Sequence, residues 1–272
     1  MRWRESRSTR VSTATRRSER LQDVPESITA FDSQDIAIRG LQQMDDYARL
    51  VPGLAISQRE PGGTTVVFRG VTTSGLNFGS VSSSALYLDE QPITASGRSP
   101  DPRLIDIERV EALRGPQGSL YGASSQSGTL RVITNKADAQ DFDAWAEAQL
   151  SSTSDGGVSH DVSAMVNVPL VQDKLAVRLV GFSAEDAGFI DRVLSDSPGG
   201  TYTNADVVDE DVNTVKTTGA RASLRWNAAD NVNATLGVVF QDVEADGHGD
   251  ITRGAGELAQ VGFGEEGLDD NW

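Results

Sequence analysis

The chain has 272 residues, with 24 lysines and arginines against 40 aspartates and glutamates, and a formal net charge of −16. An acidic body argues against a nucleic-acid-binding protein, because basic side chains that neutralise phosphates supply most of that affinity. The chain has no cysteine, which excludes a disulfide scaffold, a thiolate metal site and a cysteine nucleophile.

Residues 1–23 form a polar, arginine-rich segment without periodic apolar positions. This composition is typical of a flexible tail. The segment starts with basic residues, but it has neither the apolar core nor the small-residue cleavage site of a signal peptide. We therefore expect the natural start of the protein to lie upstream of Met1. No run of about 18 apolar residues occurs in the chain, so the sequence predicts no transmembrane helix.

Residues 24–136 show the mixed pattern of a compact α+β domain. Asp32 or Ser33 can cap a short helix that Gly40 ends. A second helical turn is predicted to begin at residues 45–46. Short strands rich in β-branched and aliphatic residues are predicted at residues 27–31, 54–58, 64–70, 85–88, 110–113 and 129–134.

Three connections in this domain are rich in glycine, serine and threonine: residues 60–63, 72–83 and 95–100. Loops of this composition lie on the surface and commonly carry binding. Pro100 and Pro102 introduce a third predicted helical turn, at residues 104–107.

From residue 141 to residue 272, apolar and polar residues alternate. A period of two predicts strands with one apolar and one polar face. The alternation is clearest at residues 144–150, 175–179, 220–226 and 232–241.

The same alternation occurs in a soluble sandwich, whose apolar face turns inward, and in a membrane barrel, whose apolar face turns to lipid. The connections at residues 169–174 and 228–231 are short, whereas residues 185–215 form a long, acidic connection. Bacterial barrels pair short periplasmic turns with long external loops, which favours the barrel. At about 9–11 residues per membrane strand, this part holds about five strands, too few to close a barrel. We therefore predict the antiparallel strands of an incomplete transmembrane β-barrel, and a chain that is part of a longer molecule.

A strand, a glycine-rich bend and a second strand occupy residues 110–136, with glycines at positions 115, 118, 122 and 128. This stretch resembles the plug domain of TonB-dependent outer-membrane receptors. Further matches precede it in the same order: Val24-Pro25, Leu50-Val51-Pro52-Gly53-Leu54, Val67-Phe68-Arg69-Gly70-Val71, Tyr87-Leu88-Asp89-Glu90 and Asp106-Ile107-Glu108-Arg109-Val110-Glu111.

The resemblance implies an α+β plug domain at residues 24–136 and the start of the barrel at residues 141–272, in the outer membrane of a Gram-negative cell. Receptors of this family bind a scarce small solute outside. A short N-terminal segment, the TonB box, then pairs as an added strand with the periplasmic domain of TonB. Here the candidate TonB box is Val11, Ser12, Thr13, Ala14 and Thr15, although Ser12 interrupts the apolar pair that usually precedes Thr-Ala.

Three loops at the plug apex are implied to face the ligand. Their candidate residues are Arg59, which ends the strand before the first loop, Asn77 and Phe78 in the second loop, and Ser96 and Arg98 in the third. Arginines and aromatics suit anionic or chelated ligands such as an iron chelate. Cobalamin, a sugar or an aromatic compound also fits, and for any single one of these residues a solvated loop position is the favoured interpretation. No cofactor is implied.

Arg69 and Arg114 match plug arginines of the family that pair with glutamates of the barrel wall. Glu147 is the candidate partner, because it lies on the polar side of the strand predicted at residues 144–150. The plainer interpretation is that each arginine only packs within the protein and pairs with a nearby carboxylate. This differs little from the pairing with the wall.

No catalytic site is predicted. Residues 115–128 lack the lysine of a P-loop, and no serine has the Gly-x-Ser-x-Gly pattern. His160 and His248 lie far apart in sequence, and neither has metal-ligand spacing. The acidic run at residues 209–211 fits a solvated loop. The sequence favours an energy-coupled uptake receptor. The alternatives are a receptor-derived fragment that binds ligand or TonB without transport, and a secreted enzyme built on a β-sandwich.

Overall fold

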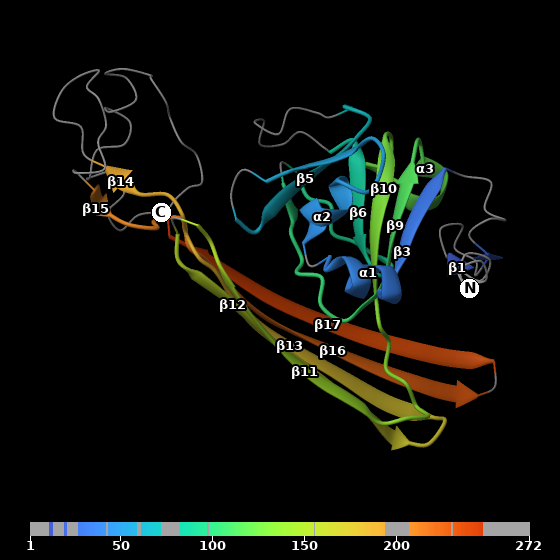
Figure 1. The fold of residues 1–272 in the computed structure, drawn as a ribbon. Helices are drawn as coiled ribbons and strands as arrows, with labels where there is room; N and C mark the ends of the chain where they lie inside the picture. The colour runs from blue at the N-terminus through green and yellow to red at the C-terminus, as the bar shows by residue number, and fades with distance from the viewer. Residues whose placement is uncertain are drawn as a thin grey trace, which may run out of the picture. The chain divides into compact units, whose positions relative to one another are not determined.

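The structure, a computed structural model, describes residues 11–12, 19–20, 27–41, 43–58, 61–71, 82–96, 98–154, 156–193, 207–229 and 231–246. Its internal contacts divide the chain into two compact units (Figure 1). Unit 1 comprises residues 1–58 and 62–136, and unit 2 comprises residues 59–61 and 137–272. No helix in the described ranges is long and apolar enough to cross a membrane.

Unit 1 is built on a five-stranded mixed sheet. Its central strand, β10, pairs antiparallel with β9 and parallel with β6, whereas β3 is an edge strand that pairs with β9 alone. In spatial order the strands are β3 (Ile28–Asp32), β9 (Ile107–Arg114), β10 (Gly128–Thr134), β6 (Ser84–Leu88) and β7 (Gln91–Pro92).

Short helices and a small second sheet complete unit 1. The side chain of Asp32 accepts a hydrogen bond from the Asp35 backbone N at 2.8 Å and so caps the first helix, which Gly40 ends with a φ of 62°. The helices are α1 (Ser33–Arg39), α2 (Met44–Ala48) and α3 (Gly118–Tyr121). The remaining strands are β4 (Leu54–Ser57), β5 (Gly63–Phe68) and β8 (Ser99–Pro100), with the separate pair β1 (Val11–Ser12) and β2 (Glu19–Arg20).

One face of the five-stranded sheet carries the apolar core of unit 1. Phe31, Val110 and Val132 are register partners across β3, β9 and β10, and all three are buried. Met44 and Tyr47 of α2 belong to the same buried cluster. Because successive strand residues point to opposite faces, their sequence neighbours are left on the other side of the sheet.

The predicted strands and the first two helices of unit 1 are confirmed within a few residues, but the helical turn predicted at residues 104–107 is wrong. Residues 101–105 have no regular structure, and Ile107 already belongs to β9, with Thr134 as its partner. Asp106 has a φ of 56°, in the left-handed region, which a right-handed helix cannot include. Helix α3 and strands β7 and β8 were not predicted, because two to four residues are too few to show a period.

Unit 2 is a five-stranded antiparallel sheet of long strands that follow one another in the order β11, β12, β13, β16 and β17. Short turns join β12 to β13 and β16 to β17, and the long connection follows β13, as predicted. The strands are β11 (Asp143–Ser152), β12 (Val158–Val171), β13 (Leu175–Asp186), β16 (Val215–Ala229) and β17 (Val232–Ala245). The small pair β14 (Arg192–Val193) and β15 (Val207–Asp209) lies within the long connection.

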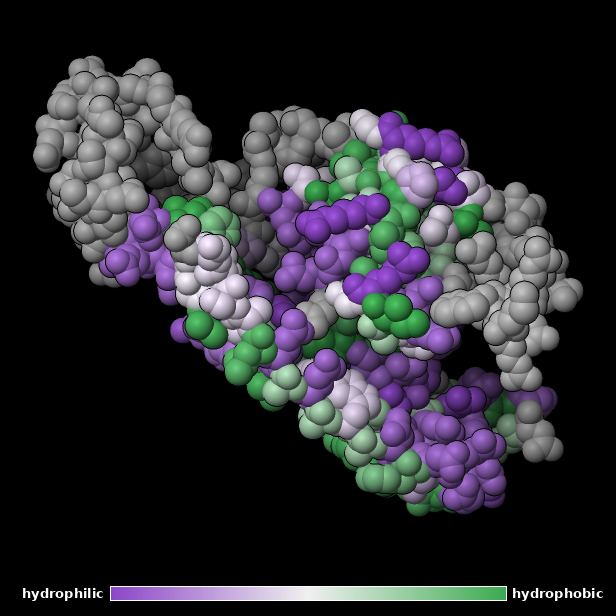
Figure 2. Space-filling view, viewed as in Figure 1, coloured by the Kyte–Doolittle hydropathy of each residue, from purple (hydrophilic) through white to green (hydrophobic). Residues whose placement is uncertain are grey.

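Register assigns the alternating residues of unit 2 to two faces, as the sequence predicts. Ala164, Gly181, Ala220 and Phe240 form one row across four strands, and Leu179, Ala222 and Val238 lie on the same face. The rows between them hold polar residues such as Glu147, Ser163 and Gln241 on the opposite face. The large apolar side chains are exposed: Val162, Leu179, Leu224, Trp226, Leu236, Val238 and Phe240. Figure 2 shows hydrophobic side chains (green) uncovered along these strands.

Gly128, at the start of β10, leaves no room for a side chain. A Cβ at this position would lie 2.5 Å from the ring of Phe68, which is fully buried, and 2.7 Å from the carbonyl oxygen of Leu113. We expect Gly128→Ala to lower the free energy of unfolding by about 1–3 kcal/mol, the usual cost of overpacking. Pulse proteolysis in urea measures this, with Gly118→Ala as the control, because no atom lies within 4 Å of a Cβ there. Equal stability of the two variants would contradict the prediction.

Candidate functional site

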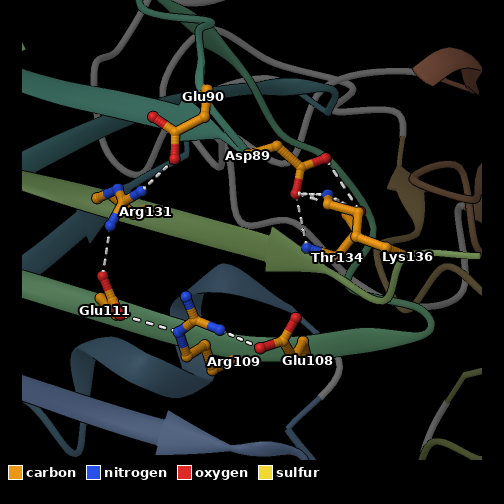
Figure 3. Close-up of polar contacts among 8 residues, drawn as sticks. All are labelled: Asp89, Glu90, Glu108, Arg109, Glu111, Arg131, Thr134 and Lys136. Atoms are coloured by element: carbon orange, nitrogen blue, oxygen red, sulfur yellow. Dashed lines mark hydrogen bonds and ion pairs between the residues drawn. The ribbon is translucent and has the colours of Figure 1, made fainter. Parts of the chain in front are cut away.

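A chain of ion pairs crosses the polar face of the unit 1 sheet (Figure 3). Arg131 of β10 and Glu111 of β9 are register partners, and Arg131 Nη1 lies 2.6 Å from Glu111 Oε2. Both side chains are fully buried. Burying two charges is costly in water-free surroundings unless each is paired and hydrogen-bonded, and further groups complete this pair.

The chain continues from this pair in both directions. Arg131 Nη2 lies 2.8 Å from Glu90 Oε1, and Arg109 Nε lies 2.9 Å from Glu111 Oε1. Arg109 also pairs with Glu108. The two end carboxylates are exposed, at 62% for Glu90 and 46% for Glu108, so the network runs from the surface through the interior and out again.

Tyrosines cover the buried arginine. The ring of Tyr121, in α3, lies 5.3 Å from Arg131 Cζ, within the range of a cation–π contact. The Tyr87 hydroxyl donates to the Tyr121 carbonyl oxygen at 2.7 Å, and the two rings meet edge to face. The glycine-rich bend therefore places an aromatic ring over the central charge of the sheet.

A second polar cluster lies at the end of β10, also shown in Figure 3. One carboxylate oxygen of Asp89 accepts from the Thr134 backbone N at 2.9 Å, and the other accepts from the Thr134 hydroxyl at 3.0 Å. Lys136 pairs with the same carboxylate. Asp89 has a φ of 55°, a conformation that Asp and Asn adopt more readily than other side chains.

These clusters are suited to hold strands together rather than to perform chemistry. Each charge named above faces an opposite charge on a neighbouring segment or residue. No group of three or more His, Asp or Glu side chains that could hold a metal ion occurs among the residues that the structure describes.

Two of the three predicted ligand loops lie beside each other. Asp101, which follows β8, accepts a hydrogen bond from the Gln58 side chain, and its backbone N donates to the Gly62 carbonyl oxygen at 3.2 Å. Arg98 is half-buried and packs over Gly63, where an added Cβ would lie 3.3 Å from Arg98 Cδ. The first and third loops are thus joined at their bases.

Asp101 titrates at an unusual pH. The pKa of Asp101 is raised to about 6, chiefly by burial. The hydrogen bond from Gln58 and the charge of Arg103 oppose this rise, and the charge of Asp45 adds to it. The carboxyl group that joins the two loop bases therefore changes charge in mildly acidic solution.

The other predicted ligand residues divide into two groups. Ser96 is exposed in the connection between β7 and β8. Arg59, Asn77 and Phe78 lie outside the described residues. Their roles stay predictions.

The candidate TonB box is described in part. The backbone of Val11 and Ser12 forms β1, which pairs antiparallel with Glu19 and Arg20, and Thr13, Ala14 and Thr15 lie outside the described residues. The flexibility predicted for residues 1–23 stays a prediction.

The three residues predicted to join plug and wall are described separately. Arg69 is exposed, with a φ of 52°, and Arg114 is half-buried at the end of β9. Glu147 is exposed on the polar face of β11. Their pairing stays a prediction.

Sequence reasoning missed the ion-pair chain, and a signal for it was present. Glu111 and Arg131 are the charged residues in two otherwise apolar runs, Val110–Leu113 and Leu130–Ile133. A charge in a fully buried strand needs a partner, and two such strands in one motif predict each other as partners. Gln58 and Asp101 carried no comparable signal, because they lie 43 residues apart in irregular segments.

Comparison with known proteins identifies a matching family and several relatives of the chain. The model of the family described as TonB-dependent Receptor Plug Domain matches residues 20–129. The pesticin receptor of Yersinia pestis is 33% identical over 136 residues, which cover 48% of this chain and 19% of that protein. The vitamin B12 transporter BtuB of Vibrio vulnificus is 31% identical over 170 residues, covering 57% of this chain and 27% of that protein.

The fold has solved counterparts as well. The pyoverdine outer membrane receptor FpvA from Pseudomonas aeruginosa PAO1, bound to pyoverdine, superposes with a TM-score of 0.67 and 21% identity. The match covers 90% of this chain and 32% of that receptor, so it includes strands of unit 2 as well as unit 1. The chain spans about a fifth to a quarter of the length of the curated relatives it matches.

Breaking the central ion pair should destabilise unit 1 strongly. We expect Arg131→Met to lower the free energy of unfolding by about 3–5 kcal/mol, because the fully buried Glu111 loses the closer of its two arginine partners and keeps only Arg109. Arg131→Met combined with Glu111→Leu should recover much of this loss. The exposed pair of Arg49 and Asp45 is the control, since Arg49→Ala should cost at most about 1 kcal/mol. Urea unfolding followed by pulse proteolysis measures all three, and an Arg131→Met loss no larger than the control would refute the assignment.

Proposed function

The chain belongs to the TonB-dependent outer-membrane receptors, as a plug domain with strands of the barrel wall, and from this premise we propose that it serves the energy-coupled uptake of a small solute. Its location is the outer membrane of a Gram-negative cell, and it is a receptor rather than an enzyme. Unit 1 is the plug, and unit 2 is the part of the wall that follows it.

The observation that carries the proposal is the apolar face of the unit 2 sheet. On β17 this face runs from Val232 through Ala234, Leu236 and Val238 to Phe240. At about 3.4 Å per residue the run is about 27 Å long, which at a strand tilt of about 40° gives a height of about 21 Å, within the roughly 25 Å apolar band of outer-membrane barrels. Both the height and the exposure of this face fit contact with lipid.

The bound solute is proposed from the plug loops. Arg59 directly follows Gln58 in the sequence, and Arg98 packs over Gly63. Guanidinium groups of these two loops would favour an anionic ligand. Asn77, Phe78 and Ser96 would add polar and aromatic contacts from the neighbouring loops. Relatives named for pyoverdine and vitamin B12 support a chelated or bulky solute, and we favour an iron chelate.

The energy for release would come from TonB. We assign Val11, Ser12, Thr13, Ala14 and Thr15 as the segment that pairs with the periplasmic domain of TonB. The short strand at Val11–Ser12 supports this, because a segment that already pairs with Glu19–Arg20 has the extended backbone that strand addition requires.

Arg114 and Arg69 would hold the plug against carboxylates of the wall, with Glu147 as the candidate acceptor. The Nε of Arg114 is buried and has no hydrogen-bond partner among the described residues. A buried donor without an acceptor is costly, so this arginine is suited to receive a carboxylate.

A second candidate function is binding without transport, by a receptor-derived fragment that only captures ligand or TonB. Measured uptake distinguishes it from the first, because binding alone leaves no solute inside the cell.

Uptake should depend on the N-terminal segment. Cells that lack the gene, and cells that regain it, are tested with ferric pyoverdine, ferric yersiniabactin and cobalamin as probes. We expect Ser12→Pro to abolish uptake of the transported probe while its binding to cells persists, because proline removes a backbone donor from the added strand. Ser8→Pro, outside the segment, is the control and should leave uptake intact. Unchanged uptake of every probe on deletion of the gene would remove the transport proposal.

The assignment of the lipid-facing side has a separate test. Ala222 lies in the middle of the apolar face, between Leu179 and Val238. We expect Ala222→Arg to cost about 2–4 kcal/mol at this depth and to deplete the folded protein from the outer membrane. Thr235→Arg, on the polar face of β17, should be tolerated. Heat-modifiable migration in gel electrophoresis of membrane fractions measures both, and the reverse order would show that the faces are exchanged.

A further inference from the structure

The first and third loops of unit 1 meet where β5 begins and β8 ends. Gly63 of β5 lies opposite Pro100 of β8 in the antiparallel pairing of these strands. One residue beyond this pair, the Asp101 backbone N donates to the Gly62 carbonyl oxygen at 3.2 Å. These four residues form the loop junction, which holds the backbone of Asp101 in place between the two loops.

The side chain of Asp101 joins the loops a second time. Its carboxyl group accepts a hydrogen bond from the side-chain amide of Gln58, which directly follows β4. Asp101 is half-buried, so its charge is only partly hydrated. An amide is neutral, and it offsets the cost of burying a charge less well than an opposite charge does. The neutral form of this carboxyl therefore costs less to bury than the ionised form.

Two charged residues act on this carboxyl with opposite sign. Asp45 of α2 disfavours a second negative charge nearby, whereas Arg103, in the same segment as Asp101, favours it. Asp45 is itself engaged in an exposed ion pair with Arg49 at 3.2 Å. The two influences oppose each other, which leaves burial as the main effect on Asp101.

The loops themselves supply further charges. Arg98, three residues before Asp101, is half-buried and packs over Gly63 of the loop junction. The first loop adds an arginine and a glutamate at residues 59–60, which lie outside the described residues. Among the described groups, Arg98 is therefore the cation of the third loop beside which an anion would bind.

Asp101 changes charge in a pH range that histidine usually covers. The pKa of its carboxyl is raised to about 6, chiefly by burial, whereas an ordinary aspartate ionises at about pH 4. The carboxyl is thus neutral in mildly acidic solution and negative at neutral pH. Neither histidine of the chain, His160 or His248, belongs to unit 1, so neither can supply this change there.

The state of the carboxyl decides how the loop junction treats an anion. A negative Asp101 repels an anion that binds beside Arg98, whereas the neutral acid does not. Protonation keeps the junction closed, because a carboxylic acid can donate to the Gln58 amide oxygen while its carbonyl oxygen accepts from the amide N. A bound anion in turn favours the protonated form, so anion binding and proton uptake strengthen each other by the same factor.

We propose that Asp101 makes the binding of an anion at the loop junction proton-linked, so that the site takes up a proton together with an anionic chelate. Asp101 is then a specificity-determining residue, which disfavours anions at neutral pH and admits them in mildly acidic solution. This inference deepens the proposed function and rests on it, because the plug loops are the proposed ligand site.

Binding of ferric pyoverdine and ferric yersiniabactin to the full-length protein in outer-membrane vesicles tests the linkage. We expect Kd to be about three- to tenfold lower at about pH 5 than at about pH 7.5, the effect of one nearby charge that is partly screened. Asp101→Asn should bind at both pH values as tightly as the unchanged protein does in acid. Titration of the probe itself cancels in this comparison, and the uncharged probe cyanocobalamin should show no pH dependence.

Two neighbouring variants should shift the midpoint of the pH dependence in opposite directions. Gln58→Leu removes the hydrogen bond that lowers the pKa of Asp101, so the midpoint should rise. Asp45→Asn removes the charge that raises this pKa, so the midpoint should fall. Asp143→Asn, at an exposed position at the start of β11, is the control and should leave the midpoint unchanged. A merely structural role of Asp101 would alter affinity equally at every pH and leave all midpoints alike.

A second measurement needs no natural ligand. Ser57 is exposed and precedes Gln58, and the chain has no cysteine, so Ser57→Cys places a reactive thiol beside the loop junction. The thiol is labelled with methanethiosulfonates that carry either a sulfonate or a trimethylammonium group, and vesicles without the new cysteine give the background. The ratio of the two rates cancels the ionisation of the thiol. We expect the ratio of anionic to cationic labelling to rise severalfold in acid, and to stay constant when Asp101→Asn is added.

The two measurements separate the proposals. If no probe binds at any pH, the ligand assigned under the proposed function fails, whereas the labelling ratio still decides whether Asp101 controls the access of anions. A ratio that does not change with pH, or that changes as much in Asp101→Asn, would overturn the inference. Equal pH dependence of chelate binding with and without Asp101 would overturn it as well.

Discussion

The buried pair of Arg131 and Glu111 fixes the register on which unit 1 depends. Side chains alternate between the two faces of a strand, so a slip of one residue would turn Arg131 into the apolar core and Val132 onto the polar face. With Arg131 opposite Glu111, Thr134 lies at the end of β10, where its backbone N donates a hydrogen bond to the carboxylate of Asp89. This ion pair thus fixes the positions of the core residues, of the Tyr121 ring beside Arg131, and of Thr134 at the end of β10.

The wall obeys a different constraint. In lipid every backbone donor and acceptor must be paired within the protein, and an antiparallel sheet with one apolar face achieves this everywhere except at its edges. Ala222 and Ser223 are adjacent in β16, yet one faces the apolar side and the other the polar side. The plug is ordered by buried charges, and the wall is ordered by the alternation of mostly apolar and mostly polar positions.

Much of the fold was predictable because its signals are local. Neighbouring residues determine the helix cap at Asp32, the helix end at Gly40 and the alternation along Val232–Phe240. The structure confirms all three. The failure at residues 104–107 has an equally local cause that the sequence does not reveal, namely the left-handed conformation of Asp106. The site was predicted less well, since the contact of Gln58 with Asp101 joins segments without any periodic pattern.

By itself, the sequence determined the class of the molecule: a glycine-bent plug motif followed by strands with one apolar and one polar face. Composition and the spacing of apolar residues are properties of short stretches of sequence, so they can be read without knowing the structure. Only the tertiary structure decided which charges meet, that β10 lies at the centre of its sheet, and that Asn167 binds the backbone of Asp138, 29 residues away. These choices depend on which distant segments become neighbours. The sequence marks Glu111 and Arg131 as charges within apolar runs, but the local pattern around Asn167 gives no sign of its partners.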